Sequence, residues 1–474
     1  MRTMTRLYIV LLLGFTCVVQ TTALVCPYSV RAGCECTASA VTCRNLQEFP
    51  PLFPGASMNG IPVLSFENGN ITTISSGSLP AGLTELWLIG HPLTNISDDA
   101  FDASRATLRH VMIKNAEFQA LPRALLKLTG LIDLEIRHTD IEYWDTAILK
   151  HLTPRLEKLE LQNVSLSAWP TWISDFHSLS SLDLSFNSLK SIPDDAFSSI
   201  TDSLTELRLS QTDLTQLPQA LSTLSSLTYL NLNYNTLTDA SEVERIAGFP
   251  FAQKLSALYL DDVGLNRTPN FSNLTSLTQL DIDFNKLSDI PNGSLPASLT
   301  TFSASYNDLS EIPADISSLP RLEYLSLSAN RISEIKSNTL SSRLIELNIY
   351  NNNITIITNT TLRNLRRLTY LYLDSNPIST ISRSAFADLV SLRYVYFEDS
   401  HLTEFPVAFA QLGRVADISF TTTQPLSCPC PAAQELVQWF TSLTDTTSIQ
   451  GSCSNGQPID SYLSGQCGQA TATY

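Results

Sequence analysis

The sequence is poor in basic residues. Lysine and arginine together number 29 against 45 aspartate and glutamate residues, which gives a formal net charge of −16. A protein that binds nucleic acid needs a basic face to neutralise phosphate groups. The composition therefore predicts no nucleic-acid partner, while a hydrophobic content of 43% excludes a wholly disordered chain.

Long apolar runs are missing after the first two dozen residues. The chain begins with Arg2 and Arg6, continues with an apolar segment from Leu7 to Val19, and then has small residues up to Ala23. That segment is short for a membrane span, which needs about 20 apolar residues, and its order is that of a signal peptide. A retained membrane anchor is the alternative interpretation. We expect residues 1–23 to be removed, and the polar C-terminus has no lipid-anchor signal. The predicted product is secreted and extracellular.

Cysteine is absent between residues 44 and 427. Apart from Cys17 in the predicted signal peptide, four cysteines lie near each end of the chain, at Cys26, Cys34, Cys36, Cys43, Cys428, Cys430, Cys453 and Cys467. Two even sets in an exported chain predict two disulfide-stapled ends. Zinc binding is the alternative, which the Cys-x-Cys spacing and the predicted export both disfavour.

Motifs of catalysis are missing as well. The sequence contains no G-x-S-x-G, no H-E-x-x-H and no phosphate-binding loop. Carboxylates are abundant, so pairs at the separations that glycosidases use would arise by chance. We therefore expect no enzyme activity, no catalytic residue, no cofactor and no resident metal.

What the sequence does contain is an internal repeat. The segment that starts at Leu179 fits L-x-x-L-x-L-x-x-N-x-L at each position, and further full matches start at Leu227, Leu277, Leu322, Leu344 and Leu368. Looser copies start at Ile61, Leu83, Leu108, Leu131, Leu156, Leu204, Leu255, Leu299, Leu392 and Val415. The sixteen starts lie 22 to 28 residues apart. A pattern that recurs at this period predicts a solenoid.

The repeat also predicts how one unit packs on the next. The L-x-L core alternates with period two, which predicts a short strand with one buried face. Strands stacked at about 4.8 Å form one parallel sheet over a continuous core. A buried Asn at the turn can bond the backbone of adjoining coils. Asparagine holds that position in seven units, at Asn187, Asn235, Asn285, Asn307, Asn330, Asn352 and Asn376. The first five units lack it, so we expect the N-terminal coils to be less regular or more mobile.

With this repeat the chain resembles the extracellular leucine-rich repeat proteins. The segment C-x7-C-x-C-x6-C from Cys26 resembles their N-terminal cysteine-rich cap, and the last four cysteines resemble their C-terminal cap. The resemblance implies an α/β leucine-rich repeat solenoid, or horseshoe, with a concave parallel β-sheet, convex turns and short helices, and disulfide caps at both ends. It implies an N-terminal cap at 24–60, repeats at 61–426 and a C-terminal cap at 427–474.

The same resemblance implies how the cysteines pair. In each cap the first cysteine joins the third and the second joins the fourth, which gives Cys26–Cys36, Cys34–Cys43, Cys428–Cys453 and Cys430–Cys467. The spacing alone leaves other connectivities open. Apolar residues at helical spacing in the second cap are expected to plug the last coil, at Leu436, Val437, Trp439 and Phe440.

In such a solenoid the residues between the leucines point onto the concave face. Tyrosine gathers there in the final coils, at Tyr324, Tyr350, Tyr370, Tyr372, Tyr394 and Tyr396, and it is preceded by Tyr229, Tyr234, Tyr259 and Tyr306. Asp374 and Glu398 flank the group. Stacked tyrosines on a rigid sheet give large contact area at low entropy cost, which predicts a binding site for protein or carbohydrate. The alternative is that tyrosine is present because it favours strands and cross-strand pairs.

Charged residues occupy the other concave positions. Asp261, Asp262, Asp281 and Asp283 form an acidic cluster that is a possible cation site, since Ca²⁺ accepts oxygen ligands, and a solvated acidic surface is the alternative. The N-terminal half mixes both signs, at Asp133, Glu135, Glu160, Asp183, Glu206, His110, Lys114, Arg137, Lys158 and Arg208. A metal pair of His110 with His138 is disfavoured there because only one other ligand type is near.

Nine Asn-x-Ser/Thr sequons predict a glycoprotein, at Asn70, Asn95, Asn163, Asn266, Asn270, Asn273, Asn292, Asn353 and Asn359. The resemblance then implies an extracellular recognition protein that binds a protein or glycan ligand, similar to receptor ectodomains or to polygalacturonase-inhibiting proteins. The alternative is a structural matrix or cell-wall component, similar to the cores of small leucine-rich proteoglycans.

Overall fold

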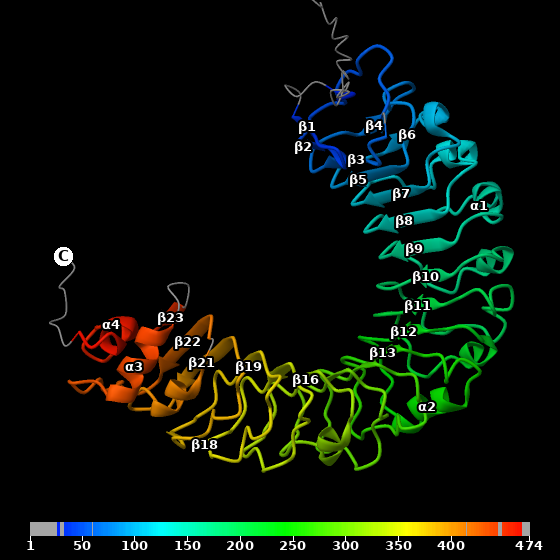
Figure 1. The fold of residues 1–474 in the computed structure, drawn as a ribbon. Coiled ribbons are helices and arrows are strands. Elements are labelled where there is room, and N and C mark those ends of the chain that lie inside the picture. The colour runs from blue at the N-terminus through cyan, green and yellow to red at the C-terminus, as the bar shows by residue number, and fades with distance from the viewer. Residues whose placement is uncertain (1–25, 29–32, 59, 414, 444–447, 467–474) are drawn as a thin grey trace, which may run out of the picture.

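The computed structural model describes residues 26–28, 33–58, 60–413, 415–443 and 448–466. Both the predicted signal peptide and Cys467 lie outside the described residues. Successive coils stack into one open arc, and the strands line its hollow side while turns and short helices form its outer side (Figure 1). None of the described helices has the length and apolarity that a membrane crossing needs.

One sheet runs along the whole described arc. Its strands, in spatial order, are β1 (Cys34–Cys36), β2 (Ala40–Arg44), β3 (Val63–Glu67), β5 (Glu85–Ile89), β7 (His110–Lys114), β8 (Asp133–Arg137), β9 (Lys158–Gln162), β10 (Ser181–Asp183), β11 (Glu206–Arg208), β12 (Tyr229–Asn231), β13 (Ala257–Tyr259), β14 (Gln279–Asp281), β15 (Thr301–Ser303), β16 (Tyr324–Ser326), β17 (Glu346–Asn348), β19 (Tyr370–Tyr372), β21 (Tyr394–Ser400), β22 (Asp417–Thr422) and β23 (Ser448–Gln450). Only the β1–β2 pair is antiparallel among these described strands. Each of the sixteen repeat segments contributes one strand of this sheet, as the period-two pattern predicts.

The outer side is built from short elements. They are the helices α1 (Thr146–Leu152) and α2 (Ala240–Glu244), the 3₁₀ helices η2 (Asp102–Ser104), η3 (Arg123–Lys127), η4 (Thr171–Asp175), η5 (Gln219–Thr223), η6 (Arg245–Gly248), η7 (Ala314–Ser318) and η8 (Val407–Gln411), and the two-stranded sheets β4 (Thr73–Ile74) with β6 (Asn95–Ile96) and β18 (Ile356–Ile357) with β20 (Thr380–Ile381). A proline precedes five of the 3₁₀ helices, as Pro313 precedes η7. Its fixed φ and missing N–H suit the residue just before or at a helix start.

The buried asparagines form the expected ladder. Asn330 donates from Nδ2 to the carbonyl oxygens of Ala304, Leu327 and Ser328 at 2.9, 3.1 and 3.1 Å, and its Oδ1 accepts from the Leu309 N–H at 2.9 Å. Each such amide therefore satisfies backbone groups of its own coil and of the coil before it.

The expectation of less regular N-terminal coils is wrong. Strands β3, β5, β7, β8 and β9 each have five residues, whereas β10 to β17 have three. These five coils keep the same turn without Asn because in each of them the residue before the Asn position has a left-handed backbone, as at Asn115 (φ 57°) and His138 (φ 49°). Other side chains also take over as acceptors, since the Thr139 hydroxyl accepts from the Ala116 N–H at 3.2 Å. The amide is one of several solutions to the same backbone requirement.

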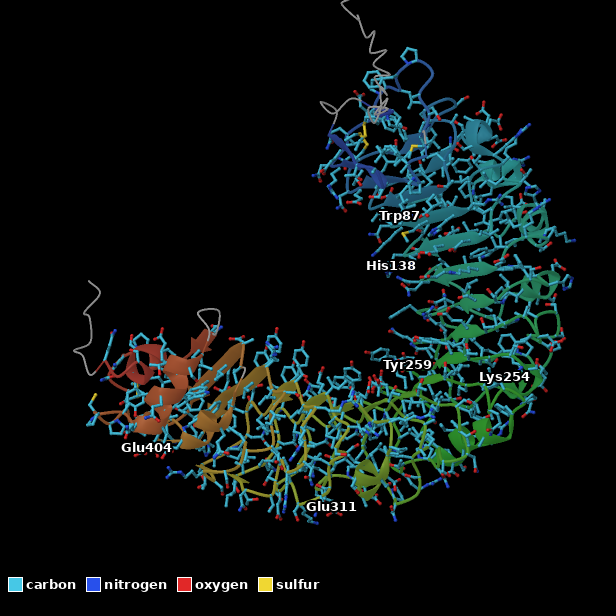
Figure 2. All side chains as sticks on the ribbon, in the orientation of Figure 1. Trp87, His138, Lys254, Tyr259, Glu311 and Glu404 are labelled. Atoms are coloured by element: carbon cyan, nitrogen blue, oxygen red, sulfur yellow. A yellow bond between two sulfur atoms is a disulfide. The ribbon has the colours of Figure 1, made fainter. Side chains whose placement is uncertain are left out.

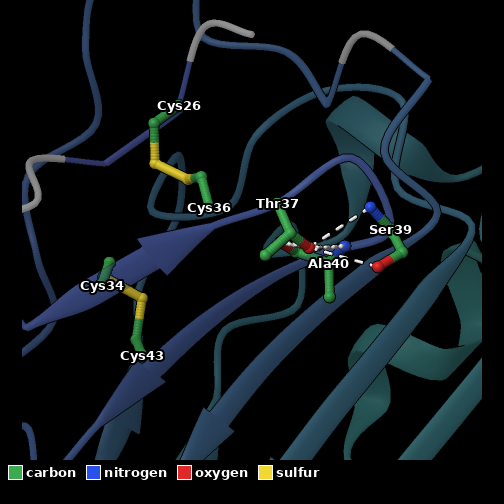
Figure 3. Close-up of a disulfide and its surroundings, with 7 residues drawn as sticks. All are labelled: Cys26, Cys34, Cys36, Thr37, Ser39, Ala40 and Cys43. Atoms are coloured by element: carbon green, nitrogen blue, oxygen red, sulfur yellow. Dashed lines mark hydrogen bonds between the residues drawn. A yellow bond between two sulfur atoms is a disulfide. The ribbon is translucent and has the colours of Figure 1, made fainter.

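Disulfides staple both ends. The structure joins Cys26 to Cys36, Cys34 to Cys43 (Figure 3), and Cys428 to Cys453, which are pairings that the resemblance implies. The Cys430–Cys467 pairing stays a prediction because Cys467 lies outside the described residues. At the C-terminal end, helix α3 (Gln434–Ser442) is followed by α4 (Ile459–Leu463). Leu436 and Trp439 are buried, and Trp439 Nε1 donates to the Leu412 carbonyl at 2.6 Å, so this helix covers the last coils as expected.

Candidate functional site

The concave face presents two rows of side chains. In most three-residue strands the first and third residues are partly exposed while the middle residue is buried, as in β19. Figure 2 shows Trp87 and Tyr259 on the inner side of the arc and Glu311 on its outer side. Parallel pairing in strict register places equivalent residues of successive coils side by side, so the two rows run continuously along the sheet.

The most ordered aromatic group on this face lies on β19 and β21. The rings of Tyr370 and Tyr394 stack at 4.7 Å between centroids with an interplanar angle of 4°. Those of Tyr372 and Tyr396 stack at 4.8 Å with an angle of 1°. Both pairs are direct partners in the sheet register, so the strand spacing itself sets the ring separation.

Two further tyrosines extend this group. Tyr324 on β16 is 43% exposed, and Tyr350, just after β17, is 37% exposed. We call the six residues Tyr324, Tyr350, Tyr370, Tyr372, Tyr394 and Tyr396 the tyrosine face. The structure thus brings all six to one stretch of the concave side, between β16 and β21.

A hollow lies beside the tyrosine face. It has a volume of about 370 Å³ and is lined by Thr301, Phe302, Ser303, Tyr324, Leu325, Ser326 and Glu346. It forms because β15 and the end of β16 carry Ser and Thr where other coils carry tyrosine. Sequence reasoning missed this feature. The available signal was a group of small residues at repeat positions where other coils carry large side chains.

The acids near the tyrosine face have two different roles. Asp374 accepts from the Glu398 N–H at 2.8 Å, and burial raises the pKa of its carboxyl to about 6, so it mainly supports the turn. Asp417 on β22, which sequence reasoning missed, pairs with Tyr394 in the register, and its Oδ1 is buried without a hydrogen-bond partner. Its position among the outward residues was the available signal. A buried carboxylate oxygen without a donor favours a ligand that supplies one.

The described strands of the C-terminal part of the concave face carry no basic residue at their outward positions. Neither Lys nor Arg occurs at the first or third residue of any described strand from β12 to β22 of the main sheet, whereas Asp281, Glu346 and Asp417 do occur there. The same face shows how it can hold a cation, since the Arg208 guanidinium lies 4.6 Å from the centroid of the Tyr229 ring. Tyrosine and carboxylate together are a favourable setting for guanidinium groups.

A second aromatic row follows the edge of the sheet. Phe186, Tyr234, Phe284 and Tyr306 are 39 to 49% exposed. All four have left-handed backbone, with φ between 53° and 61°, which is unfavourable for bulky residues. Phe284 and Tyr306 stack at 4.2 Å. Sequence reasoning identified the two tyrosines but missed the two phenylalanines, which occupy the equivalent repeat position.

The aspartate cluster is partly a structural ladder. The Asp283 N–H donates to Asp261 at 3.0 Å, and the Ser305 N–H donates to Asp283 at 2.5 Å. Asp262 lies apart from this ladder, exposed in the left-handed turn. Burial and the neighbouring carboxyls of Asp261 and Asp283 raise the pKa of Asp281 to about 9. The cation site stays a prediction, but the carboxyls of Asp261 and Asp283 already accept backbone hydrogen bonds.

Replacing Asp281 by asparagine should stabilise the protein at alkaline pH. Between about pH 4 and 9 the folded state keeps a proton on Asp281 that the unfolded state has already lost. The wild-type free energy of unfolding therefore falls as pH rises through that window. Asp281→Asn keeps the protonated shape and removes this dependence, with a gain of about 1–2 kcal/mol at pH 8 after allowance for solvent screening. Denaturant unfolding at pH 5 and pH 8 measures it. The matched control is Asp262→Asn, and an unchanged pH slope in Asp281→Asn contradicts the assignment.

Near the N-terminal end a charged band crosses β5 to β11. It comprises Glu85, His110, Lys114, Asp133, Glu135, Arg137, Lys158, Glu160, Asp183, Glu206 and Arg208. Arg137 lies between Glu135 and Glu160, with N–O distances of 2.9 and 2.8 Å. Burial raises the pKa of Glu160 to about 7. The ligand atoms that gather around His110 come from Asp133 and Glu135, whereas His138 is exposed and bonds Asn163 at 2.9 Å.

All nine sequon asparagines are exposed on the folded chain, which is the accessibility that a glycosyl transfer requires: Asn70, Asn95, Asn163, Asn266, Asn270, Asn273, Asn292, Asn353 and Asn359. Their use stays a prediction.

Comparison with known proteins yields matches in family and in structure. The leucine-rich repeat family model matches residues 177–237, 275–332, 320–378, 342–402 and 366–419. No curated protein matches by sequence. An LRR protein of Leptospira interrogans is 23% identical with a TM-score of 0.60, over 76% of this chain and 93% of that one.

Two complexes supply further structural matches. Toll from the Drosophila Toll–Spätzle complex is 18% identical with a TM-score of 0.56, over 92% of this chain and 67% of that one. TLR13 from its complex with ssRNA13 is 19% identical with a TM-score of 0.54, over 88% and 75%. At these identities the likeness concerns the fold alone.

Proposed function

Because the chain belongs to the leucine-rich repeat family, we propose that it is an extracellular recognition protein whose tyrosine face binds a basic protein ligand. A carbohydrate ligand is the competing outcome. The repeats at 61–426 act as the binding scaffold, and the cysteine-rich segments at 24–60 and 427–474 act as caps. The protein catalyses no reaction in this proposal, since the fold typically serves binding.

The observation that carries the proposal is the pair of parallel tyrosine stacks on β19 and β21. The rings are held at 4.7 and 4.8 Å by the sheet register, so little side-chain entropy remains to be lost on binding. All four rings belong to outward positions on the concave side of the sheet, where a ligand can cover both pairs at once. Aromatic anchors of this kind dominate many protein interfaces.

Charge supports a basic ligand over other classes. The tyrosine face and its surroundings combine aromatic rings with Glu346 and Asp417 and have no basic strand residue from β12 to β22 among the described outward positions. An Arg or Lys side chain gains both a ring face and a carboxylate there. Nucleic acid, which the TLR13 complex contains, would meet a repulsive surface here.

Three features typical of exported proteins support an extracellular setting. Three disulfides at the two ends suit an oxidising compartment. The predicted signal peptide and the nine exposed sequons agree with it. Toll, which resembles this chain in fold, forms a complex with Spätzle, and so offers a precedent for partner binding by such a fold.

The test is to capture partners from extracellular medium on the immobilised protein and then to measure each purified partner by calorimetry. We expect a basic protein whose affinity falls about tenfold or more as salt rises from low to high concentration, because the contact is partly electrostatic. Selective binding of a neutral glycan, with no salt dependence, would favour the carbohydrate outcome and overturn the basic ligand.

A further inference from the structure

We propose that His110, Asp133 and Glu135 form a transition-metal site on the concave face, and that zinc is the cation that fits these donors best. The site lies on β7 and β8, far along the arc from the tyrosine face, and does not depend on the proposed function. It differs from our sequence-based expectation of no resident metal.

The three side chains already lie close to ligand geometry. One ligand atom from each residue falls within 4.8 Å of the other two, and His110 Nε2 is 3.2 Å from Glu135 Oε1. Two donors of a tetrahedral zinc ion are separated by about 3.3 Å when each bond is about 2.0–2.1 Å. One pair therefore has the required spacing, and the third donor, which lies within 4.8 Å, must move closer by side-chain rotation.

The sheet makes this arrangement rigid. His110 and Asp133 are direct register partners on neighbouring strands. Asp133 and Glu135 are two residues apart on β8, so both side chains emerge on the same face. All three donors thus come from strands rather than loops, so little conformational entropy is lost when a metal fixes them together. A set of one imidazole and two carboxylates is a combination that zinc accepts.

A second layer of residues orients the donors. Glu85 Oε2 lies 4.0 Å from His110 Nδ1, the nitrogen that stays free when Nε2 binds a metal. Arg137 Nη2 lies 2.9 Å from Glu135 Oε2, which leaves the other oxygen for the metal. Carboxylates behind a ligating histidine and bonds to a ligating carboxylate are the usual outer partners of zinc sites.

A buried donor near the site supports the same assignment. Trp87 Nε1 on the adjacent strand is buried without a hydrogen-bond partner, whereas His110 Nε2 and Glu135 Oε2 meet only ion-pair partners, at 3.2 Å from Glu135 Oε1 and 2.9 Å from Arg137 Nη2. A buried polar atom that nothing bonds is costly. The indole N–H beside the donors is therefore a second indication, independent of the donor spacing, that a bound group with its own ligands completes the site.

The surrounding charge favours a cation. Six carboxylates of the charged band stand against four permanently basic side chains: Glu85, Asp133, Glu135, Glu160, Asp183 and Glu206 against Lys114, Arg137, Lys158 and Arg208. A protonated His110 in an ion pair with Glu135 is the competing arrangement. Zinc would displace that proton and add positive charge beside Asp133 and Glu135.

Calorimetry tests the site on the full secreted chain, after chelator treatment and without any histidine tag. Titration with Zn²⁺ should show one site per chain with micromolar or tighter affinity, and Ca²⁺ should give no comparable binding at this site. His110→Ala and Glu135→Gln should each weaken zinc binding by tenfold or more. The matched control is His138→Ala, which should bind as wild type does.

A spectroscopic readout separates loss of the site from loss of folding. Co²⁺ added to the chelated wild type should give visible absorption of a tetrahedral centre, and His110→Ala should lack it while keeping the wild-type circular dichroism. The proposal is wrong if wild type binds no zinc at millimolar concentration. It is also wrong if folded His110→Ala binds zinc with wild-type affinity, because the site then lies elsewhere.

Discussion

Replacing Tyr372 and Tyr396 together by alanine weakens ligand binding by about 100- to 1000-fold, while the protein stays folded. The two rings stack at 4.8 Å on the concave face, and aromatic anchors at interface centres contribute about 2 kcal/mol each when truncated. About 1.4 kcal/mol corresponds to a tenfold change in affinity, so the pair accounts for at least two decades. Calorimetry with the purified ligand measures the loss.

Matched variants separate binding from strand stability. Tyr143→Ala removes a tyrosine that is 65% exposed away from the concave strands, and it should leave affinity unchanged. Tyr372→Phe with Tyr396→Phe keeps the stack and removes both hydroxyls, so it should retain most of the affinity. If the double alanine variant lowers only the melting temperature and binds normally, these tyrosines serve the sheet and not the ligand.

Asn330→Ala should lower the free energy of unfolding by about 3–5 kcal/mol. The amide makes three donor contacts to carbonyl oxygens and accepts one backbone N–H, all in the buried turn. Alanine fills less space and leaves these groups without partners, and each unsatisfied buried group costs about 1–3 kcal/mol, partly relieved by local relaxation. Denaturant unfolding measures the loss, and amide hydrogen exchange should place it in the coils that contain residues 304–332.

The chain itself supplies a graded control. Thr212 holds the equivalent position in another coil, where its hydroxyl donates to the Leu209 carbonyl at 2.8 Å. Asn330→Thr should therefore keep one of the contacts and lose less stability than Asn330→Ala. Equal losses in the two variants would show that hydrogen bonding at this position contributes little, contrary to the ladder.

The repeat pattern determined the architecture because its information is local. Leucines at period two make each strand one-sided, and the return of the pattern every 22 to 28 residues leaves stacking as the way to bury them. The buried positions of Leu325 and Asn330 and the outward position of Tyr372 all follow from their places in one unit. The parallel sheet and the arc were predictable on that basis, and so were the tyrosines that face its hollow side.

What only the tertiary structure decided is which outward side chains meet across coils. Register and neighbouring side-chain size hold Tyr370 against Tyr394, open the hollow beside Tyr324, and bring Asp133 to His110 in place of His138. The same cross-coil contacts make Asp261 and Asp283 hydrogen-bond acceptors and keep the N-terminal turns regular without asparagine. The repeat sets where a residue points, but distances between coils depend on lateral packing, which no single unit encodes.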